Sequence, residues 1–277
     1  MNISVLILTY NEEVNIRRTI SNVIDWADQV IVVDSYSDDN TVKIVKEYDV
    51  KVYFNHFINF KEQRLFALRE TAISNEWVLF LDADEWLTDE LKDEIDETLK
   101  STELDGFLIK RRFYFMGSWI RYGGYYPSWN LRLFKRNLAT VNREINEHIH
   151  IDGLVGSLKN DMVDENKKSF SEWITKHNVY SDFESLQLNS KNQDELADLF
   201  GNKIERKRWV RENIWNKFLP PLLRPFLYFI YRYFLRLGFL DGKEGFIYHF
   251  NHALVYRLFI DVKFLEFKKN ETNNTRP

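Results

Sequence analysis

Four short apolar runs, each followed by a segment with helical spacing of apolar residues, fill the first hundred residues of the chain. The runs are Ile3–Leu8, Val30–Val33, Val50–Phe54 and Trp77–Leu81. Their length and their content of branched aliphatic residues are typical of buried strands. Strands that alternate with helices across short loops predict a largely parallel sheet with helices on its faces, the doubly wound α/β class.

Helix signals separate these runs. A cap and first-turn acids at Asn11, Glu12 and Glu13 predict a helix that carries Val14, Ile20, Val23 and Ile24 on its apolar face. We expect a second helix to open at Asp38-Asp39-Asn40-Thr41 and to carry Val42, Val45 and Tyr48 on one face. An amphipathic helix over Phe60–Ile73 and an acidic surface helix over Thr88–Leu99, capped by Thr88, complete the set.

The fourth run ends at two carboxylates, Asp82 and Asp84, with Ala83 between them. In an open α/β sheet, ligands bind at the carboxyl ends of the strands. Carboxylates at such a turn suit a hard divalent cation that keeps some waters and shares its other positions with phosphate oxygens. The pattern therefore favours a metal and phosphate site, and the alternative is a solvated turn.

The other strand ends are also polar. They are the segment from Thr9 to Glu13, Asp34 with Ser35, and the residues near Asn55. No glycine-rich phosphate loop follows the first strand, which argues against a dinucleotide dehydrogenase. A diphosphate at this edge needs a metal and basic side chains. Lys61 and Arg64 are the candidates, with plain surface charges as the alternative.

Composition narrows the class further. The chain has 277 residues, of which 44% are hydrophobic and 29% charged, as in a folded protein. It has no cysteine, so disulfides and thiolate metal sites are excluded and a reducing compartment is expected. The net charge of −4 gives no reason to expect nucleic acid as a partner. The first residues lack the pattern of a secretory signal, which predicts a cytoplasmic protein.

The middle of the chain combines two further strands with a long aromatic loop. Residues 106–115 and 130–136 are the expected strands, and the loop Trp119–Trp129 lies between them. A loop of this kind fits a lid or a sugar-stacking surface, and a packed irregular cover is the alternative. Residues 172–216 are expected to be helical.

Aromatic residues and arginines crowd the C-terminal third. Prolines and arginines interrupt every window over 208–236, so a transmembrane helix is not expected. Interleaved aromatic and basic residues favour a segment that lies in the headgroup interface of an anionic membrane, and a helical subdomain packed on the core is the alternative. We expect a catalytic domain over 1–205, a membrane-associating region over 206–269 and a disordered tail over 270–277.

Several motifs resemble those of family-two inverting glycosyltransferases of GT-A fold. The N-terminal ones are Ile3–Glu13, Val32–Ser35 with Asp38–Thr41, and Leu81–Glu85. Later blocks are similar to the bacterial lipopolysaccharide core β-glucosyltransferases: Phe60–Arg64, Asn146–His148, Lys176–Tyr180 and Leu237–Gly242. The resemblance covers nearly the whole chain and implies the GT-A fold and transfer from a nucleotide sugar.

The resemblance also implies roles for individual residues. Thr9, Tyr10 and Glu13 would border the nucleotide, and Asp34 would accept a hydrogen bond from the base. Asp82 would hold the ribose or a metal-bound water, and Asp84 would bind Mg²⁺ or Mn²⁺ directly. Ser35 stands where the family often has a second acid, which puts base recognition in doubt.

Inversion requires a carboxylate that takes the proton of the acceptor hydroxyl. Glu147 matches the acid of the family in an x-Glu-His context, with Asn146 where histidine is common. Glu144 and Asp152 are its competitors. His148 and His150 have a spacing that fits metal ligands on a strand, although core or surface histidines are the commoner explanation.

These observations predict a metal-dependent inverting transferase. It would move a hexose, glucose by the resemblance, from a UDP-sugar to a lipid-linked saccharide such as lipopolysaccharide core, at the cytoplasmic face of the inner membrane. A polyprenyl-phosphate sugar transferase is the nearest alternative, and that reaction does not need Glu147. A non-catalytic nucleotide-sugar-binding protein is the other alternative.

Overall fold

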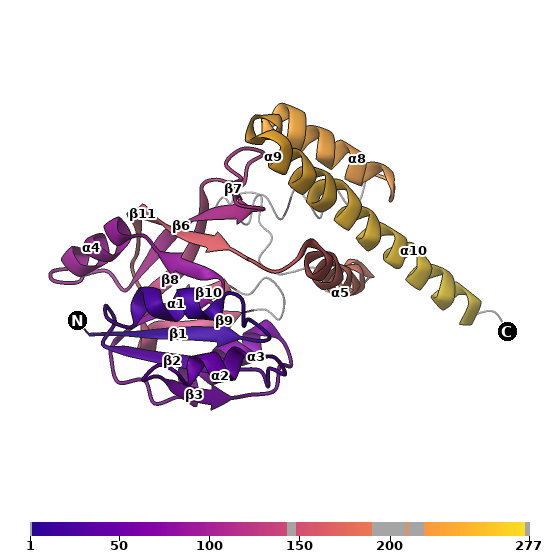
Figure 1. The fold of residues 1–277 in the computed structure, drawn as a ribbon. Coiled ribbons are helices and arrows are strands. Elements are labelled where there is room, and N and C mark those ends of the chain that lie inside the picture. The colour runs from indigo at the N-terminus through magenta and orange to yellow at the C-terminus, as the bar shows by residue number, and fades with distance from the viewer. Residues whose placement is uncertain (1, 143–147, 190–208, 210–218, 275–277) are drawn as a thin grey trace. The chain divides into compact units, whose positions relative to one another are not determined.

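The computed structural model describes residues 2–142, 148–189, 209 and 219–274 (Figure 1). The chain divides into two compact units. The first contains the chain up to Arg121 and Tyr125–Lys168, and the second contains Tyr122–Gly124 and the chain from Ser169 onward. This division does not test the boundary that we predicted after residue 205, between a catalytic domain and a membrane-associating region, and that boundary stays a prediction.

The first unit is built on a mixed sheet. Among the described residues its strands follow the order β3-β2-β1-β4-β8-β6-β11-β5, with β7 beside β6. Four parallel strands form one half: β1 (Ile3–Thr9), β2 (Gln29–Asp34), β3 (Lys51–Phe54) and β4 (Trp77–Asp82). These are the four apolar runs, so the predicted α/β class is confirmed.

The other half of the sheet reverses direction at β8. This strand, Ser128–Lys135, is antiparallel to both β4 and β6. The remaining strands are β5 (Glu85–Leu87), β6 (Gly106–Phe115), β7 (Ser118–Trp119) and β11 (Val155–Glu165). A separate hairpin pairs β9 (Ala139–Asn142) with β10 (His148–Ile151). The predicted aromatic loop is therefore shorter than expected, because both of its ends belong to strands.

Helices cover both faces of the sheet. They are α1 (Ile16–Val23), α2 (Thr41–Val45), α3 (Phe60–Arg69) and α4 (Asp89–Thr98). Alternate residues of each strand face opposite sides. Val5, Ile7 and Leu79 join α1, α2 and α4 in one core, whereas Leu6 and Phe80 join α3 in the other. Because both faces are buried, β1, β2 and β4 are largely apolar.

Two helix boundaries differ from the prediction. The first helix begins at Ile16, later than the cap at Asn11 and the first turn at Glu12 and Glu13 that we predicted, because these three residues form hydrogen bonds with residues 38–41 instead. Asn11 itself has a left-handed backbone (φ 52°). Val14, expected on the apolar face, is consequently exposed. The third helix ends at Arg69, before the predicted Ile73. The cap of α4 is confirmed, since the Thr88 hydroxyl accepts the Leu91 N–H at 3.2 Å.

The second unit is helical where it is described. Its α-helices are α5 (Phe170–Asn189), α8 (Leu223–Ile230), α9 (Gly242–His249) and α10 (Tyr256–Asn274). Short π-helical segments, Tyr231–Leu235 and Phe250–Val255, and a 3₁₀ turn at Gly238–Asp241 link α8, α9 and α10. α10 runs to Asn274, so the tail predicted to be disordered from residue 270 is helical over its first residues.

A buried ion pair joins two helices of this unit. Asp261 of α10 accepts hydrogen bonds from Arg224 Nε at 2.7 Å and from the Leu222 backbone N–H at 2.8 Å. The second contact fixes the residue before α8, which has a positive φ of 70°. No helix in the described residues is both long and apolar enough to cross a membrane.

Candidate active site

All four of the predicted strand ends lie at one edge of the sheet. Thr9 of β1 is opposite Asp34 of β2, and Leu8 is opposite Asp82 of β4. Asn55, which follows β3, donates its backbone N–H to the Asp34 carbonyl at 3.0 Å. Parallel register therefore gathers the polar residues that separate parts of the sequence place at strand ends.

Asp34 is buried within its own loop. Its carboxylate accepts the Ser37 backbone N–H at 2.7 Å, the Ser37 hydroxyl at 2.6 Å and the Thr9 hydroxyl at 3.2 Å. Asp34 thus shapes the turn after β2, and Thr9 supports it. Recognition of a nucleobase by Asp34 stays a prediction.

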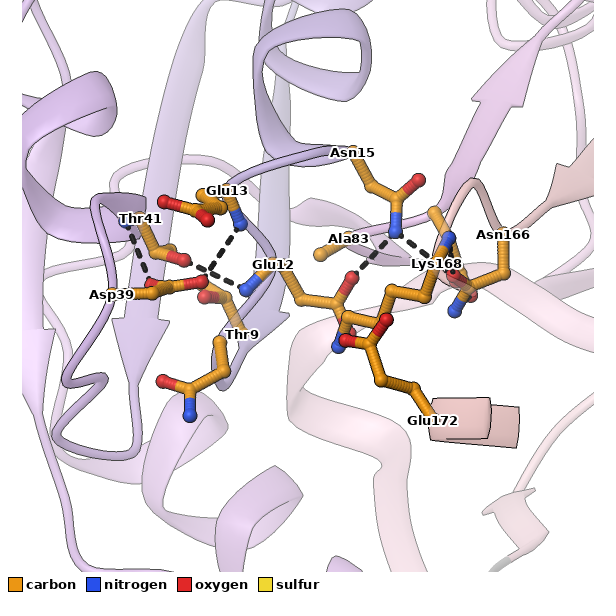
Figure 2. A network of polar contacts seen from close by, with 12 residues as sticks. Thr9, Glu12, Glu13, Asn15, Asp39, Thr41, Ala83, Asn166, Lys168 and Glu172 are labelled. Carbon is orange, nitrogen blue, oxygen red and sulfur yellow. Dashed lines mark hydrogen bonds and ion pairs between the residues drawn. The ribbon is translucent and has the colours of Figure 1, made fainter. Parts of the chain in front are cut away.

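The loop after β1 is tied to the start of α2, as Figure 2 shows. The Glu13 carboxylate accepts the Asn40 backbone N–H at 3.0 Å and its side-chain amide at 2.7 Å. The Thr41 hydroxyl accepts the Glu12 N–H at 2.7 Å. Glu13 is therefore engaged with Asn40, whereas Tyr10 in the same loop is 55% exposed.

Asp82 lies in an ion-pair cluster. Its two carboxylate oxygens lie 3.2 Å from Arg64 Nη2 and 2.7 Å from Arg132 Nη2, and its side chain is still 38% exposed. Desolvation alone would raise the pKa of Asp82, but Arg132 and Arg64 outweigh it and hold that pKa well below the usual range. Asp82 is therefore ionised at neutral pH.

Glu85 is the buried member of the same cluster. It lies 2.6 Å from Arg132 Nη2 and accepts the Asp82 backbone N–H at 2.9 Å. Burial raises the pKa of Glu85, repulsion from Asp82 and Asp164 adds to the shift, and attraction to Arg132 opposes it. Arg111 lies 2.9 Å from Asp164 and 4.0 Å from Glu85. Glu85 and its arginines brace the strand that carries Asp82.

Asp84 has a different environment. Its Oδ2 accepts a hydrogen bond from Asn166 Nδ2 at 2.9 Å, and its backbone carbonyl accepts the Glu165 N–H at 3.1 Å. The neighbouring Ala83 carbonyl accepts the Thr19 hydroxyl at 2.6 Å. These contacts hold the turn after β4 in place and leave Asp84 half-buried.

Glu12, Asn15, Asn166 and Lys168 form a polar network around this turn, and we did not predict it (Figure 2). Glu12 lies 2.6 Å from Lys168 Nζ and accepts the Asn15 side-chain amide at 2.7 Å. Asn15 also donates to Asn166 Oδ1 at 3.2 Å, and Asn166 in turn holds Asp84. The network joins the loop after β1, the turn after β4 and the residues after β11.

Burial raises the pKa of Glu12, and repulsion from Asp84 adds to the shift, while Lys168 and Asn15 oppose it. Lys168 therefore balances the charge of Glu12 beside Asp84. This network was missed because β11 was not predicted as a strand. Asn166 directly follows β11, so a predicted strand there would have placed Asn166 at the sheet edge where ligands bind.

Comparison with known proteins identifies the family. Residues 4–159 match the family described as Glycosyl transferase family 2. The chain belongs to glycosyltransferase family 2. It is 32% identical over 254 residues to an uncharacterized glycosyltransferase of Rickettsia typhi, an alignment that covers 88% of this chain and 80% of the relative. A similar protein of Rickettsia prowazekii is 31% identical over 256 residues, with 88% and 80% covered.

One solved structure illustrates the wider likeness. The S. aureus TarS 1-349 complex with UDP-GlcNAc is 15% identical, covers 98% of this chain and 92% of its own, and gives a TM-score of 0.47. With the family established, the described sheet and its flanking helices are those of the predicted GT-A fold.

The two predicted basic residues of this family 2 glycosyltransferase have different surroundings. Arg64 is buried, pairs with Asp82 and lies over the Phe80 ring at 5.0 Å. The guanidinium of Arg64 is therefore already in contact with other side chains of the protein. Lys61, in the first turn of α3, is half-buried, and its contact with a diphosphate stays a prediction.

The predicted base lies outside the described residues. Glu147 and its competitor Glu144 both fall in the segment 143–147. Asp152 is described and exposed, and its backbone N–H donates to the Leu138 carbonyl at 3.2 Å. The strand expected to carry His148 and His150 is confirmed as β10.

The donor set at the turn fits a hard divalent cation. Within the described ranges, no cluster of three or more histidine, aspartate or glutamate side chains forms a complete metal site. Mg²⁺ and Mn²⁺, however, are commonly held by one or two carboxylates together with substrate phosphates. Asp84 offers a carboxylate of that type.

Proposed function

We propose that this family 2 glycosyltransferase is a metal-dependent inverting hexosyltransferase. It moves a hexose, with glucose as the first candidate, from a UDP-sugar to a lipid-linked saccharide of the lipopolysaccharide core type. The observation that carries the proposal is the turn after β4. There Asp84 is held by Asn166 next to Glu12, at the edge where β1, β2 and β4 end together.

The nucleotide is assigned to the loop after β1. Tyr10 is an exposed aromatic side chain of that loop, and an aromatic ring can stack on a base. Thr9, Glu13 and Asp34 hold the loop in shape through the hydrogen bonds described above. Because Asp34 is buried, it would reach a base only after the Ser37 hydroxyl turns aside.

The diphosphate is assigned to the neighbourhood of Asp84, which would hold Mg²⁺ or Mn²⁺. When bound, that ion supplies positive charge that stabilises the departing diphosphate. Asp82 orients the donor ribose from the ion-pair cluster, and Lys61 adds a positive charge from α3. Glu147 takes the proton from the acceptor hydroxyl as the hydroxyl oxygen attacks the anomeric carbon, and a single displacement of this kind inverts the configuration.

A lipid-linked acceptor is supported by the exposed surface of the second unit. Apolar side chains are exposed between α8 and α9, among them Phe234, Leu235, Leu237, Phe239 and Leu240. Arg232 and Arg236 lie in the same stretch. Exposed apolar residues beside arginines fit the headgroup region of an anionic membrane, and so a peripheral position on the cytoplasmic face of the inner membrane.

The first test is a donor screen with purified enzyme, in which released nucleoside diphosphate is measured over a panel of nucleotide sugars with Mg²⁺ or Mn²⁺. We expect Asp84→Asn to lower turnover by at least about a hundredfold, since the variant loses a charge at the proposed cation position. Asp93→Asn, an exposed carboxylate on α4, is the matched control and should keep full activity. Full turnover by Asp84→Asn would refute the metal assignment.

Glu147→Gln tests the base in the same assay. Loss of transfer, together with inverted configuration of the wild-type product by NMR, supports a hydroxyl acceptor. A phosphate acceptor is already deprotonated, so survival of activity in Glu147→Gln would point to polyprenyl-phosphate transfer instead.

A further inference from the structure

Asn166, which directly follows β11, holds one oxygen of the proposed cation ligand. Its Nδ2 donates to Asp84 Oδ2 at 2.9 Å. β11 is antiparallel to β5, and Asp164 pairs with Glu85. The next N–H along β11, that of Glu165, donates to the Asp84 carbonyl at 3.1 Å. The register of the two strands therefore places Asn166 beside Asp84.

The side-chain amide of Asn166 has one orientation that satisfies its neighbours (Figure 2). Its Oδ1 accepts two hydrogen bonds, from Asn15 Nδ2 at 3.2 Å and from the Lys168 backbone N–H at 2.8 Å. Asn15 is buried and is itself fixed, because its Oδ1 accepts the Lys167 backbone N–H at 2.9 Å. Since an amide nitrogen cannot accept these hydrogen bonds, Nδ2 of Asn166 has to point at Asp84.

The two carboxylate oxygens of Asp84 differ in their contacts. Within the part of the chain that the structure describes, Oδ2 accepts the Asn166 amide and Oδ1 accepts no hydrogen bond. The backbone of the turn is held as well, because the Ala83 carbonyl accepts the Thr19 hydroxyl at 2.6 Å. With the backbone and Oδ2 both fixed, Oδ1 is the oxygen that Asp84 can offer to a cation.

We propose that Asn166 is a positioning residue that makes Asp84 a one-oxygen ligand of Mg²⁺ or Mn²⁺, with Oδ1 as the coordinating atom. The inference rests on the proposed metal assignment, and it deepens that assignment by naming the residue that sets how Asp84 coordinates. Hydrogen bonds to ligating carboxylates orient them and contribute to metal affinity.

This arrangement favours Mg²⁺ over Ca²⁺. Mg²⁺ demands near-octahedral geometry, which the narrow angle between the two oxygens of one carboxylate distorts. Ca²⁺ has a larger and more flexible coordination shell and accepts a carboxylate through one oxygen or through both. An Asp84 side chain released from Asn166 can offer both oxygens to one ion, so Ca²⁺ should tolerate the loss of Asn166 better than Mg²⁺.

The test measures binding of UDP by calorimetry, so its outcome does not depend on turnover. The full chain is titrated with UDP in EDTA, in Mg²⁺ and in Ca²⁺. The dissociation constant in EDTA, divided by the constant with an ion, gives the gain in affinity that this ion supplies. We expect the wild type to gain at least about tenfold with Mg²⁺ and less with Ca²⁺.

Variants at Asn166 assign the effect to this residue. Asn166→Ala should lower the gain with Mg²⁺ about tenfold and the gain with Ca²⁺ less than about threefold, and should leave binding in EDTA unchanged. Asn166→Leu, which also lacks the N–H but is close to asparagine in size, should behave in the same way. Asn160→Ala is the matched control, because Asn160 lies within β11 and donates to the Glu90 carbonyl at 3.1 Å. It should change none of the three constants, and urea denaturation checks that each variant is folded.

A wild-type gain with Mg²⁺ in both Asn166 variants would overturn the inference. Equal losses for the two ions, or weaker binding in EDTA, would overturn it as well, since a general disturbance of the turn produces those results. Asp84→Asn separates the inference from the proposal on which it rests. If Asp84→Asn keeps the gain, the proposed cation position is wrong. If Asp84→Asn loses the gain and the Asn166 variants keep it, only the role of Asn166 is refuted.

Discussion

The two aspartates of the Asp82-Ala83-Asp84 turn have different partners, although the sequence presents them as a pair. Asp82 is held by the guanidinium groups of Arg64 and Arg132, whereas Asp84 accepts a hydrogen bond from Asn166. Asp82 is the last residue of β4, whereas Asp84 lies in the turn that follows, so the two carboxylates meet different elements. This difference supports the proposed roles, an orienting one for Asp82 and cation binding for Asp84.

Arg132 provides a test at the residue scale. Its guanidinium is 7% exposed and lies 2.7 Å from Asp82 and 2.6 Å from Glu85. Arg132→Met leaves these carboxylates without their shared cation, and we expect the free energy of unfolding to fall by about 3–5 kcal/mol in urea denaturation at pH 7.

Two further variants complete this experiment. Adding Glu85→Gln to Arg132→Met should restore part of the stability. The double variant no longer contains the buried Glu85 carboxylate, which Arg132→Met alone leaves without Arg132 as its partner. Arg69→Met, on the exposed side of α3, should change stability by less than about 0.5 kcal/mol. If Arg132→Met behaved like Arg69→Met, the cluster would not be a source of stability.

At the scale of elements, loops and turns carry the candidate site while the strands position it. The loop after β1, the turn after β4 and the residues after β11 meet through Glu12, Asn15 and Asn166. Each of these segments follows a strand that runs in the same direction, so the sheet brings together residues about 150 positions apart in sequence, as for Asn15 and Asn166. A rigid sheet edge with polar loops is how α/β enzymes usually build sites.

The packing of α5 on α10 yields a prediction about acid. His177 of α5 stacks on Trp173, with ring centres 3.6 Å apart, and meets Tyr256 of α10 edge-on at 5.1 Å. Burial lowers the pKa of His177 to about 4, and the charges of Lys176 and Arg257 add to the shift. Burial likewise places the pKa of His252 well below its usual value.

The direction in which stability changes with pH follows from proton binding. Between pH 6.5, the ordinary pKa, and about pH 4, the unfolded chain binds more protons at His177 than the folded one, so stability falls as the pH falls through this window. A shift of this size corresponds to at most about 3 kcal/mol. We expect hydrogen exchange of α5 and α10 to accelerate over this range.

His177→Phe should flatten the pH dependence of exchange in α5, since phenylalanine keeps the stacking and does not titrate. His56→Phe, at an exposed histidine of the first unit, should leave it unchanged. An identical pH profile for His177→Phe and the wild type would show that His177 is not the titrating group.

For the molecule as a whole, the division into two units separates the candidate chemistry from the proposed membrane contact. The polar strand ends belong to the first unit, and the exposed apolar residues at 234–240 belong to the second. Holding enzyme and acceptor on one surface raises their effective concentration. The transferase reaction and the membrane contact can therefore be tested with separate substitutions.

Vesicle binding tests the second unit. We expect the wild type to sediment with vesicles that contain anionic phospholipid, and the double variant Leu235→Glu with Phe239→Glu to bind at least about tenfold more weakly, because charge replaces inserted apolar side chains. Leu235 is 71% exposed, so the change should not disturb a core. Leu154→Glu, an equally exposed leucine of the first unit, is the control. Wild-type protein that stays in the supernatant with all vesicles would refute the membrane contact.

Much of the fold could be predicted from the sequence. The apolar runs give β1 to β4. β1, β2 and β4 are largely buried on both faces, and such strands are largely apolar. Thr88 marks the start of α4, because its hydroxyl satisfies a free N–H at the helix end. Helix α1 was placed too early, since Asn11, Glu12 and Glu13 look like a cap and its first turn. Their side chains or backbone groups form hydrogen bonds with residues 38–41 instead, and these residues lie near them only in the folded chain.

The sequence by itself determined the α/β class, the family and the position of the two aspartates at a strand end. All three depend on local periodicity and short motifs. Only the tertiary structure decided that Asp34 and Arg64 are occupied by the protein and that Asn166 reaches Asp84. The physical reason is that strand order and register, and not distance along the chain, decide which charges become neighbours.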